Sequence, residues 1–86
     1  MGTSSFKLDV LLFGPAAASA GCSSVRVVCD VGATCDAVRE SLCAQHAAIA
    51  SIVRAGRLAV NGVYVDGATV IGAGDEVALV SLVSGG

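Results

Sequence analysis

Hydrophobic residues at the start of the chain alternate with polar ones, which predicts a strand with one buried face. Four apolar side chains stand at every second position: Phe6, Leu8, Val10 and Leu12. Lys7 and Asp9 occupy the intervening positions. Leu11 and Phe13 then make the end of the strand apolar on both faces, so we expect it to be central in its sheet.

The next segment, Gly14 to Ser24, contains small residues and is predicted to be a surface loop. Val25 to Cys29 is a second β-branched run, in which Arg26 is expected to face outward. Two strands joined in this way favour a hairpin with a long connection rather than a tight turn.

Helical spacing begins after Thr34, which is a typical helix N-cap, and Asp36 lies in the first turn. The predicted helix runs from about Cys35 to His46 or slightly beyond. Its buried face consists of Cys35, Val38 and Leu42. The side chains expected to face water are Arg39, Glu40 and Gln45. Ala47 to Ala55 either extends this helix or forms a separate turn, with Gly56 at its end. Its core residues are expected to be Ile49, Ile52 and Val53.

Short strands and turns fill the rest of the chain. Leu58 to Val60 and Val63 to Val65 flank Asn61-Gly62, the strongest hairpin signal present. Further turns are predicted at Asp66-Gly67 and Gly72 to Asp75, followed by a long apolar strand from Glu76 to Val83. These elements predict an α+β fold, with one main helix packed on one face of a mixed sheet.

The length of 86 residues indicates one domain over residues 1–86, with a flexible tail at 84–86. The net charge of −2 and the 3% aromatic content argue against binding to nucleic acid or to an anionic membrane surface. The hydrophobic fraction is 55%, yet no run is long enough to span a membrane. A globular domain with apolar surface left for a partner explains this composition.

The cysteines do not have the spacing of a metal or redox motif. They stand at Cys22, Cys29, Cys35 and Cys43. The one histidine, His46, could join only Cys43 in a short ligand pair, so no metal site is predicted. Residues 1–22 resemble a short signal peptide, but Lys7 is the only basic residue that precedes its apolar run, Asp9 lies beside that run, and Gly14-Pro15 ends it early. We therefore expect a cytoplasmic protein with reduced cysteines that behave as small apolar residues.

No conventional catalytic set is evident from the residues. His46 has no nucleophile at motif spacing and is expected to be a helix-end or surface histidine. Asp75 is expected to form a turn by bonding to its own backbone. The sequence ends differently, because a buried-type strand leads directly into Ser84-Gly85-Gly86. Two glycines lack Cβ atoms, so they can enter a narrow channel and leave a carboxylate unhindered.

This combination resembles the ubiquitin-like β-grasp sulfur carriers of the MoaD/ThiS superfamily, and most closely the molybdopterin synthase small-subunit branch. The resemblance rests on Val10 to Phe13, the Thr34-capped helix, and Leu58 to Gly62. Its most specific parts are Gly74 to Ala78 and the ending Val83 to Gly86. The chain lacks the two prolines common before the terminal glycines, and it lacks the Arg-Glu pair common after the first strand. Its long loop at Gly14 to Ser24 favours the molybdopterin branch over the shorter thiamine-type carriers.

The resemblance implies a β-grasp fold and a role as sulfur donor in molybdenum cofactor biosynthesis. An E1-like activating enzyme would use ATP to adenylate the Gly86 carboxylate, and a sulfur donor would convert it to a thiocarboxylate. The thiocarboxylate would then donate sulfur to cyclic pyranopterin monophosphate inside the large synthase subunit. Ser84 and Gly85 would form the thin tail that inserts there. No side chain of this chain would act as acid, base or nucleophile, and no permanently bound cofactor is implied.

Three alternatives remain open at the level of sequence. The chain could be a thiamine-type or other pathway sulfur carrier, which the identity of its large partner would reveal. It could be a ubiquitin-related modifier joined to lysines, because that role also needs Gly85-Gly86. It could also be a non-catalytic interaction domain in which the two glycines are incidental.

Overall fold

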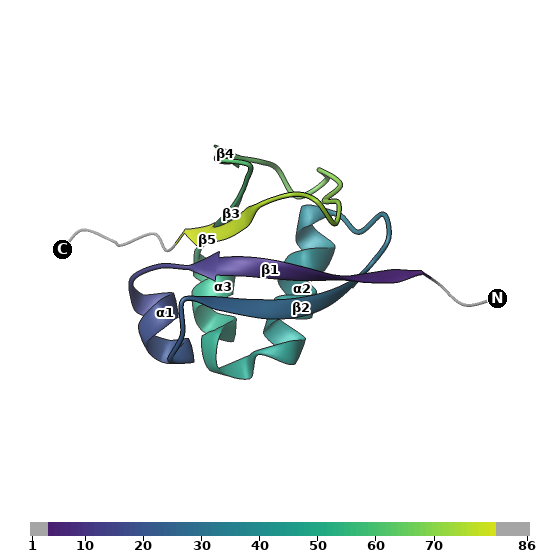
Figure 1. The fold of residues 1–86 in the computed structure, drawn as a ribbon. Helices are drawn as coiled ribbons and strands as arrows, with labels where there is room; N and C mark the ends of the chain where they lie inside the picture. Colours follow the sequence, from purple (N-terminus) through teal and green to yellow (C-terminus); the bar gives the residue numbers. More distant parts are fainter. Residues whose placement is uncertain (1–3, 81–86) are drawn as a thin grey trace.

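The computed structural model describes residues 4–80 of the chain, which form one mixed sheet and several short helices (Figure 1). In chain order the elements are β1 Ser5–Leu12, α1 Pro15–Ala20, β2 Ser24–Asp30, α2 Cys35–Gln45, the 3-10 turn η1 Ala47–Ile49, α3 Ala50–Ala55, β3 Arg57–Val60, β4 Val63–Tyr64 and β5 Val77–Val80. The strand order is β2-β1-β5-β3-β4. β1 and β5 are parallel, and the other neighbours are antiparallel. The predicted mixed sheet, with β1 inside it, is confirmed.

The core lies between one face of this sheet and the helices, which cover it from the same side (Figure 1). β1 contributes the alternating residues of its predicted buried face: Leu8, Val10 and Leu12. The remaining fully buried large residues of the described chain are Val27, Val38, Leu42, Ile49, Val53, Leu58, Ile71, Val77 and Leu79. All are aliphatic, so dispersion contacts and removal of apolar surface from water hold the two layers together.

α2 begins and ends close to the predicted residues. The Thr34 hydroxyl accepts a hydrogen bond from the Ala37 amide at 3.2 Å, as expected of an N-cap. Two further amides of the first turn donate to a distant loop: Cys35 to the Thr69 carbonyl at 2.7 Å and Asp36 to the Gly67 carbonyl at 3.1 Å. These bonds attach the loop after β4 to the start of the helix.

The segment after α2 is a separate element rather than an extension of the helix. His46 breaks the helical backbone at φ −132°, and η1 and α3 follow. Ile49 and Val53 are buried as predicted, and Ile52 packs partly against the core. Gly56 ends α3, as expected.

The prediction of a loop over Gly14 to Ser24 was wrong in part, because Pro15–Ala20 forms α1. Pro15 stands at the helix start, where its missing N–H is not needed. Gly21 ends the helix in the left-handed conformation at φ 73°, and its amide donates to the Ala17 carbonyl. Ala16 is completely buried, so this short helix packs against the core instead of lying free on the surface.

The outer edge of β2 is paired with side chains from the end of α2. The Gln45 amide group accepts from the Val28 N–H at 2.9 Å and donates to the Val28 carbonyl at 3.0 Å. His46 Nε2 lies 2.7 Å from the Arg26 carbonyl, which requires that nitrogen to be the protonated one. Gln45 is exposed, as predicted, but it also makes both hydrogen bonds that a neighbouring strand would make.

Candidate functional site

The candidate reactive residues, Ser84, Gly85 and Gly86, lie outside the described residues. The part of the site that the structure places is β5, the strand that precedes them in the chain. Val77 and Leu79 point into the core and are fully buried, whereas Ala78 and Val80 lie on the outer face. The predicted strand from Glu76 to Val83 is confirmed over Val77–Val80, and its last three residues are among those not described.

β5 is fixed by strands on both sides. Leu79 is aligned with Leu12 of β1 in parallel register and with Leu58 of β3 in antiparallel register. Val77 is aligned in the same way with Val10 and Val60. A strand with ladder partners on both edges and alternate residues in the core cannot slip by one position without exposing those residues. The chain therefore reaches Val80 at a defined place in the sheet.

The start of β5 is fixed by a hydrogen-bond cluster that joins two motifs distant in sequence. Asn61, in the hairpin turn, donates from its backbone amide to the Glu76 carbonyl at 2.7 Å. Its side-chain oxygen accepts from the Glu76 amide at 3.0 Å, and its Nδ2 donates to Asp75 Oδ1 at 3.1 Å. Asn61 thus lengthens the β3–β5 pairing by its side chain. The sequence indicates both turns but gives no sign that they meet.

Asp75 closes the turn before β5, as predicted. Its Oδ2 accepts from the Gly72 amide at 2.8 Å. The Gly72 N–H, followed by the Asn61 amide, stabilises the charged carboxylate and lowers the pKa of Asp75 below its ordinary value. Because both carboxylate oxygens are occupied by protein donors, this side chain serves the turn.

The outer face of the sheet has an apolar row that crosses four strands. The ladder registers align its members side by side: Leu11, Ala78, Ala59 and Tyr64. Arg57 lies over the Tyr64 ring, with its guanidinium carbon 5.0 Å from the ring centre. On the β1–β2 side the row is bordered by the exposed ion pair between Arg26 and Asp9, at 3.0 Å. An apolar centre with charges at its margin is typical of a protein docking surface.

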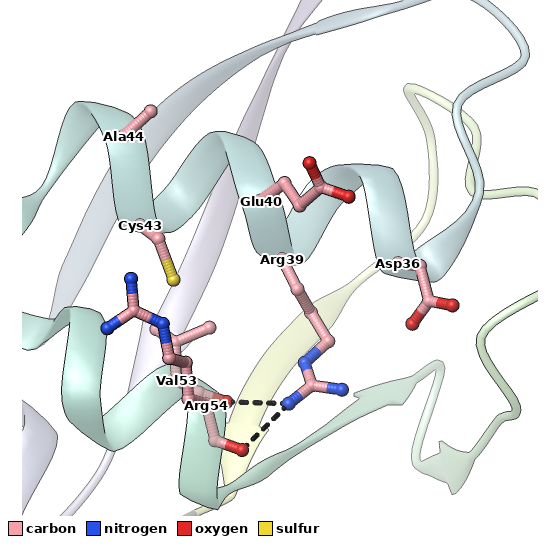
Figure 2. Close-up of a pocket in the computed structure, with 7 residues that line it drawn as sticks. All are labelled: Asp36, Arg39, Glu40, Cys43, Ala44, Val53 and Arg54. Carbon is pink, nitrogen blue, oxygen red and sulfur yellow. Dashed lines mark hydrogen bonds between the residues drawn. The ribbon is translucent and has the colours of Figure 1, made fainter.

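A groove of 510 Å³ lies on the opposite side of the molecule, between α2 and α3. Figure 2 shows its lining: Asp36, Arg39, Glu40, Cys43, Ala44, Val53 and Arg54. The prediction that Arg39 faces water was wrong. Its Nη2 is directed at the end of α3 and donates to the carbonyls of Val53 at 2.9 Å, Arg54 at 3.1 Å and Gly56 at 3.4 Å. These carbonyls have no partners within α3, and a cation offsets the negative end of that helix.

The cysteines of the described region are all free thiols. Cys29 and Cys35 are buried in the core, and desolvation raises the pKa of each thiol. Cys22 is exposed, with its sulfur 3.2 Å from the Ser24 carbonyl.

Over residues 4–80, no three His, Cys, Asp or Glu side chains come together as metal ligands would. In this part of the chain, no helix has both the length and the apolar character to cross a membrane.

Comparison with known proteins gives matches over nearly the whole chain. The model of the ThiS family matches residues 10–86. Small archaeal modifier protein 1 from Haloferax volcanii is 30% identical, with a TM-score of 0.78 over 94% of this chain and 100% of that one. A comparison with curated proteins gave no match.

Two further structures share the fold at lower identity. One is a complex of subunits 1 and 2 of the molybdopterin-converting factor from Helicobacter pylori, in which the matched chain is 18% identical. Its TM-score is 0.64, over 94% of this chain and 100% of that one. The other is a Pyrococcus furiosus protein provisionally described as molybdopterin converting factor subunit 1, and it is 22% identical to this chain. Its TM-score is 0.76, over 90% of this chain and 98% of that one. The mixed five-stranded sheet and its helices therefore form the ubiquitin-like β-grasp fold, as expected.

Proposed function

The chain belongs to the ThiS family, and we propose on this premise that it transports sulfur as a thiocarboxylate on Gly86, as the small subunit of a molybdopterin synthase. The observation that supports this most is the extent of the family match, which continues through Ser84-Gly85-Gly86 to residue 86. The fold adds a physical reason, because β5 leads toward those residues from a fixed place in the sheet.

The chemistry needs an activated carboxyl group, because a carboxylate is a poor electrophile. In the proposed reaction, a Gly86 carboxylate oxygen attacks the α-phosphorus of ATP in an E1-like enzyme, and pyrophosphate leaves. A hydrosulfide-level donor then attacks the acyl carbon through its sulfur, AMP leaves with the oxygen that bridged it to that carbon, and the sulfur-bound proton is lost. The product is a thiocarboxylate. The described side chains supply no acid or base to these steps, so their contribution is to dock the domain and to position β5.

The apolar row on the outer face of the sheet is the proposed docking surface for the activating enzyme and for the large synthase subunit. Its members are Leu11, Ala78, Ala59 and Tyr64. In the large subunit, the terminal sulfur would attack cyclic pyranopterin monophosphate, and two carriers in turn would supply both sulfurs of the product. The Helicobacter pylori structure, in which subunit 1 is bound to subunit 2, supports a partner of this kind.

A second function, attachment to target proteins, has a specific observation in its favour. The 30% identity to a small archaeal modifier protein covers that chain completely. In this case the activated Gly86 carboxyl group would form an amide with a lysine amine of a target, with loss of the activating group. Both functions use the same terminus, so they differ in the acceptor rather than in the fold.

Intact mass measurement of the chain isolated from its native cells tests the proposal. We expect a species in which one oxygen is replaced by sulfur, mapped to Gly86. A cysteine persulfide would instead add a sulfur atom without loss of oxygen, and the Cys22→Ser variant serves as a control for the exposed thiol. Deletion of Gly86 should abolish the sulfur species and leave the unfolding free energy unchanged.

The outcomes separate the candidate functions. A sulfur-bearing chain that converts cyclic pyranopterin monophosphate to molybdopterin with a large subunit supports the synthase role. A sulfur-bearing chain that supplies a different pathway indicates a thiamine-type or other carrier. Lysine conjugates without a thiocarboxylate would indicate the modifier function, and sulfur transfer that survives deletion of Gly86 would overturn the mechanism.

A further inference from the structure

We propose that Gly56 is a positioning residue for the C-terminal segment, because its missing side chain allows the corner between α3 and β3 to lie directly against the Val80 carbonyl. This inference rests on the proposed function, since its purpose is to place the residues that continue from Val80 toward Gly86. Val80 is the last residue of β5 and the last one that the structure describes.

The evidence is a close approach between backbones. A Cβ atom at position 56 would lie 2.7 Å from the Val80 carbonyl oxygen, 3.0 Å from the Ile52 carbonyl oxygen and 3.2 Å from Leu79 Cδ1. Two of these three neighbours are backbone atoms, which cannot turn aside as a side chain can. The backbone at Gly56 is extended, with φ −95° and ψ −169°, a conformation open to any residue. Glycine is therefore required here because a Cβ atom would collide with neighbouring backbone atoms, and not because of its backbone conformation.

The corner cannot easily retreat to make room. Arg39 donates from Nη2 to the Gly56 carbonyl and to two carbonyls at the end of α3, which ties the corner to α2. The next residue, Arg57, is aligned with Val80 in the β3–β5 ladder. A Cβ atom at position 56 would therefore press on the last described residue of β5 rather than on open space.

The expected displacement is small, but it falls at Val80, where the chain leaves β5 toward the candidate reactive residues. The 2.7 Å approach is 0.7 Å shorter than the 3.4 Å at which ordinary contact begins, so the two backbones would separate by roughly that distance. Misplacement of a reacting group by about 1 Å costs on the order of 100-fold in rate. The group that reacts is the Gly86 carboxyl, six residues beyond Val80, so we expect thiocarboxylate formation to fall by less than this factor.

The test compares Gly56→Ala with two controls. Gly74→Ala is the matched glycine variant, because no atom lies within 4 Å of a Cβ atom built there and its φ is not positive. Val27→Ala, in a strand two places from β5, is the stability control, because it destabilises the core without touching Val80. For each variant, the backbone amide chemical shift of Val80, the unfolding free energy and the thiocarboxylated fraction from native cells are measured.

We expect Gly56→Ala to shift the Val80 amide and to lower the thiocarboxylated fraction. Gly74→Ala and Val27→Ala should leave both unchanged while folded. If Gly56→Ala does not fold, Arg39→Lys is used instead. All three bonds come from Nη2, and the lysine nitrogen stands one bond closer to the backbone than Nη2, so it should hold the corner less firmly and change the same two readouts less strongly. A folded variant with an unchanged Val80 amide and an unchanged thiocarboxylated fraction would overturn the inference. If the wild-type chain itself has no thiocarboxylate, the proposed function fails, and the Val80 shift alone decides whether Gly56 sets the end of β5.

Discussion

Replacement of Asn61 tests whether the hairpin turn holds the start of β5. Asn61 makes two side-chain hydrogen bonds, to Asp75 and to the Glu76 amide, and it adopts φ 54° within the turn. Gly62 follows at φ 84°, so both central residues of the turn have positive φ. Asn61→Ala removes the side-chain bonds and also places a residue that disfavours positive φ in this conformation. Asn61→Gly removes the same bonds but tolerates the conformation.

The magnitude follows from these two contributions. A net hydrogen bond contributes about 0.5–1.5 kcal/mol, and the exposed pair made by Asn61 belongs at the lower end, or about 1 kcal/mol together. The left-handed conformation costs alanine about 1 kcal/mol. We therefore expect Asn61→Ala to reduce the unfolding free energy by about 2 kcal/mol and Asn61→Gly by about 1 kcal/mol.

Urea denaturation provides the assay. With an m-value of about 1 kcal/mol/M for a small domain, the midpoint should fall by about 2 M for Asn61→Ala and about 1 M for Asn61→Gly. A change below about 0.5 kcal/mol for Asn61→Ala, the range of an ordinary surface substitution, would refute the role of the cluster.

Two further predictions concern acid stability and thiol reactivity. Because the folded-state pKa of Asp75 is lowered, its contribution is fully present above the unfolded-state pKa and disappears as pH falls below about 4 toward the folded-state value. Asp75→Asn should therefore lessen the acid dependence of the unfolding free energy in that range, and identical pH profiles would contradict this. Iodoacetamide should modify the exposed Cys22 first, whereas Cys29 and Cys35 should react only after unfolding, because burial protects them and raises the pKa of their thiols. Peptide mass mapping at short reaction times checks this order, and early modification of Cys29 would contradict it.

The main elements could be predicted from sequence because their signals are local. Alternation from Phe6 to Leu12, the Thr34 cap and Asn61-Gly62 each act within a few residues, and each element formed where it was expected. The helix at Pro15–Ala20 was missed although its signals were present: a proline at the start, an alanine run and a glycine at the end. What the sequence did not indicate was that the core would cover Ala16, which explains why so short a helix persists.

Contacts between distant segments could not be predicted in the same way. The fully buried Ile71 lies in a connecting segment without periodicity, where the Ala33 carbonyl accepts its amide hydrogen bond. Arg39 occupies a polar position of the helix pattern, but α3 brings three carbonyls within its reach. The approach of Gly56 to Val80 depends on the β3–β5 pairing, so the sequence alone shows only a glycine at the end of a helix. The candidate reactive residues at 84–86, in contrast, were identified from sequence and resemblance, and their role stays a prediction.

The amide of Gln45 has a consequence for the behaviour of the chain at high concentration. An open strand edge is a template for pairing with another molecule, and β2 forms one side of this sheet. At Val28, both the donor and the acceptor of that edge are already engaged by Gln45. An incoming strand would have to break these two hydrogen bonds before it could form its own. Val28 lies inside the strand, so the new ladder of hydrogen bonds would be interrupted there. Gln45, together with His46 at the Arg26 carbonyl, therefore protects an apolar domain against growth into sheet aggregates at this edge.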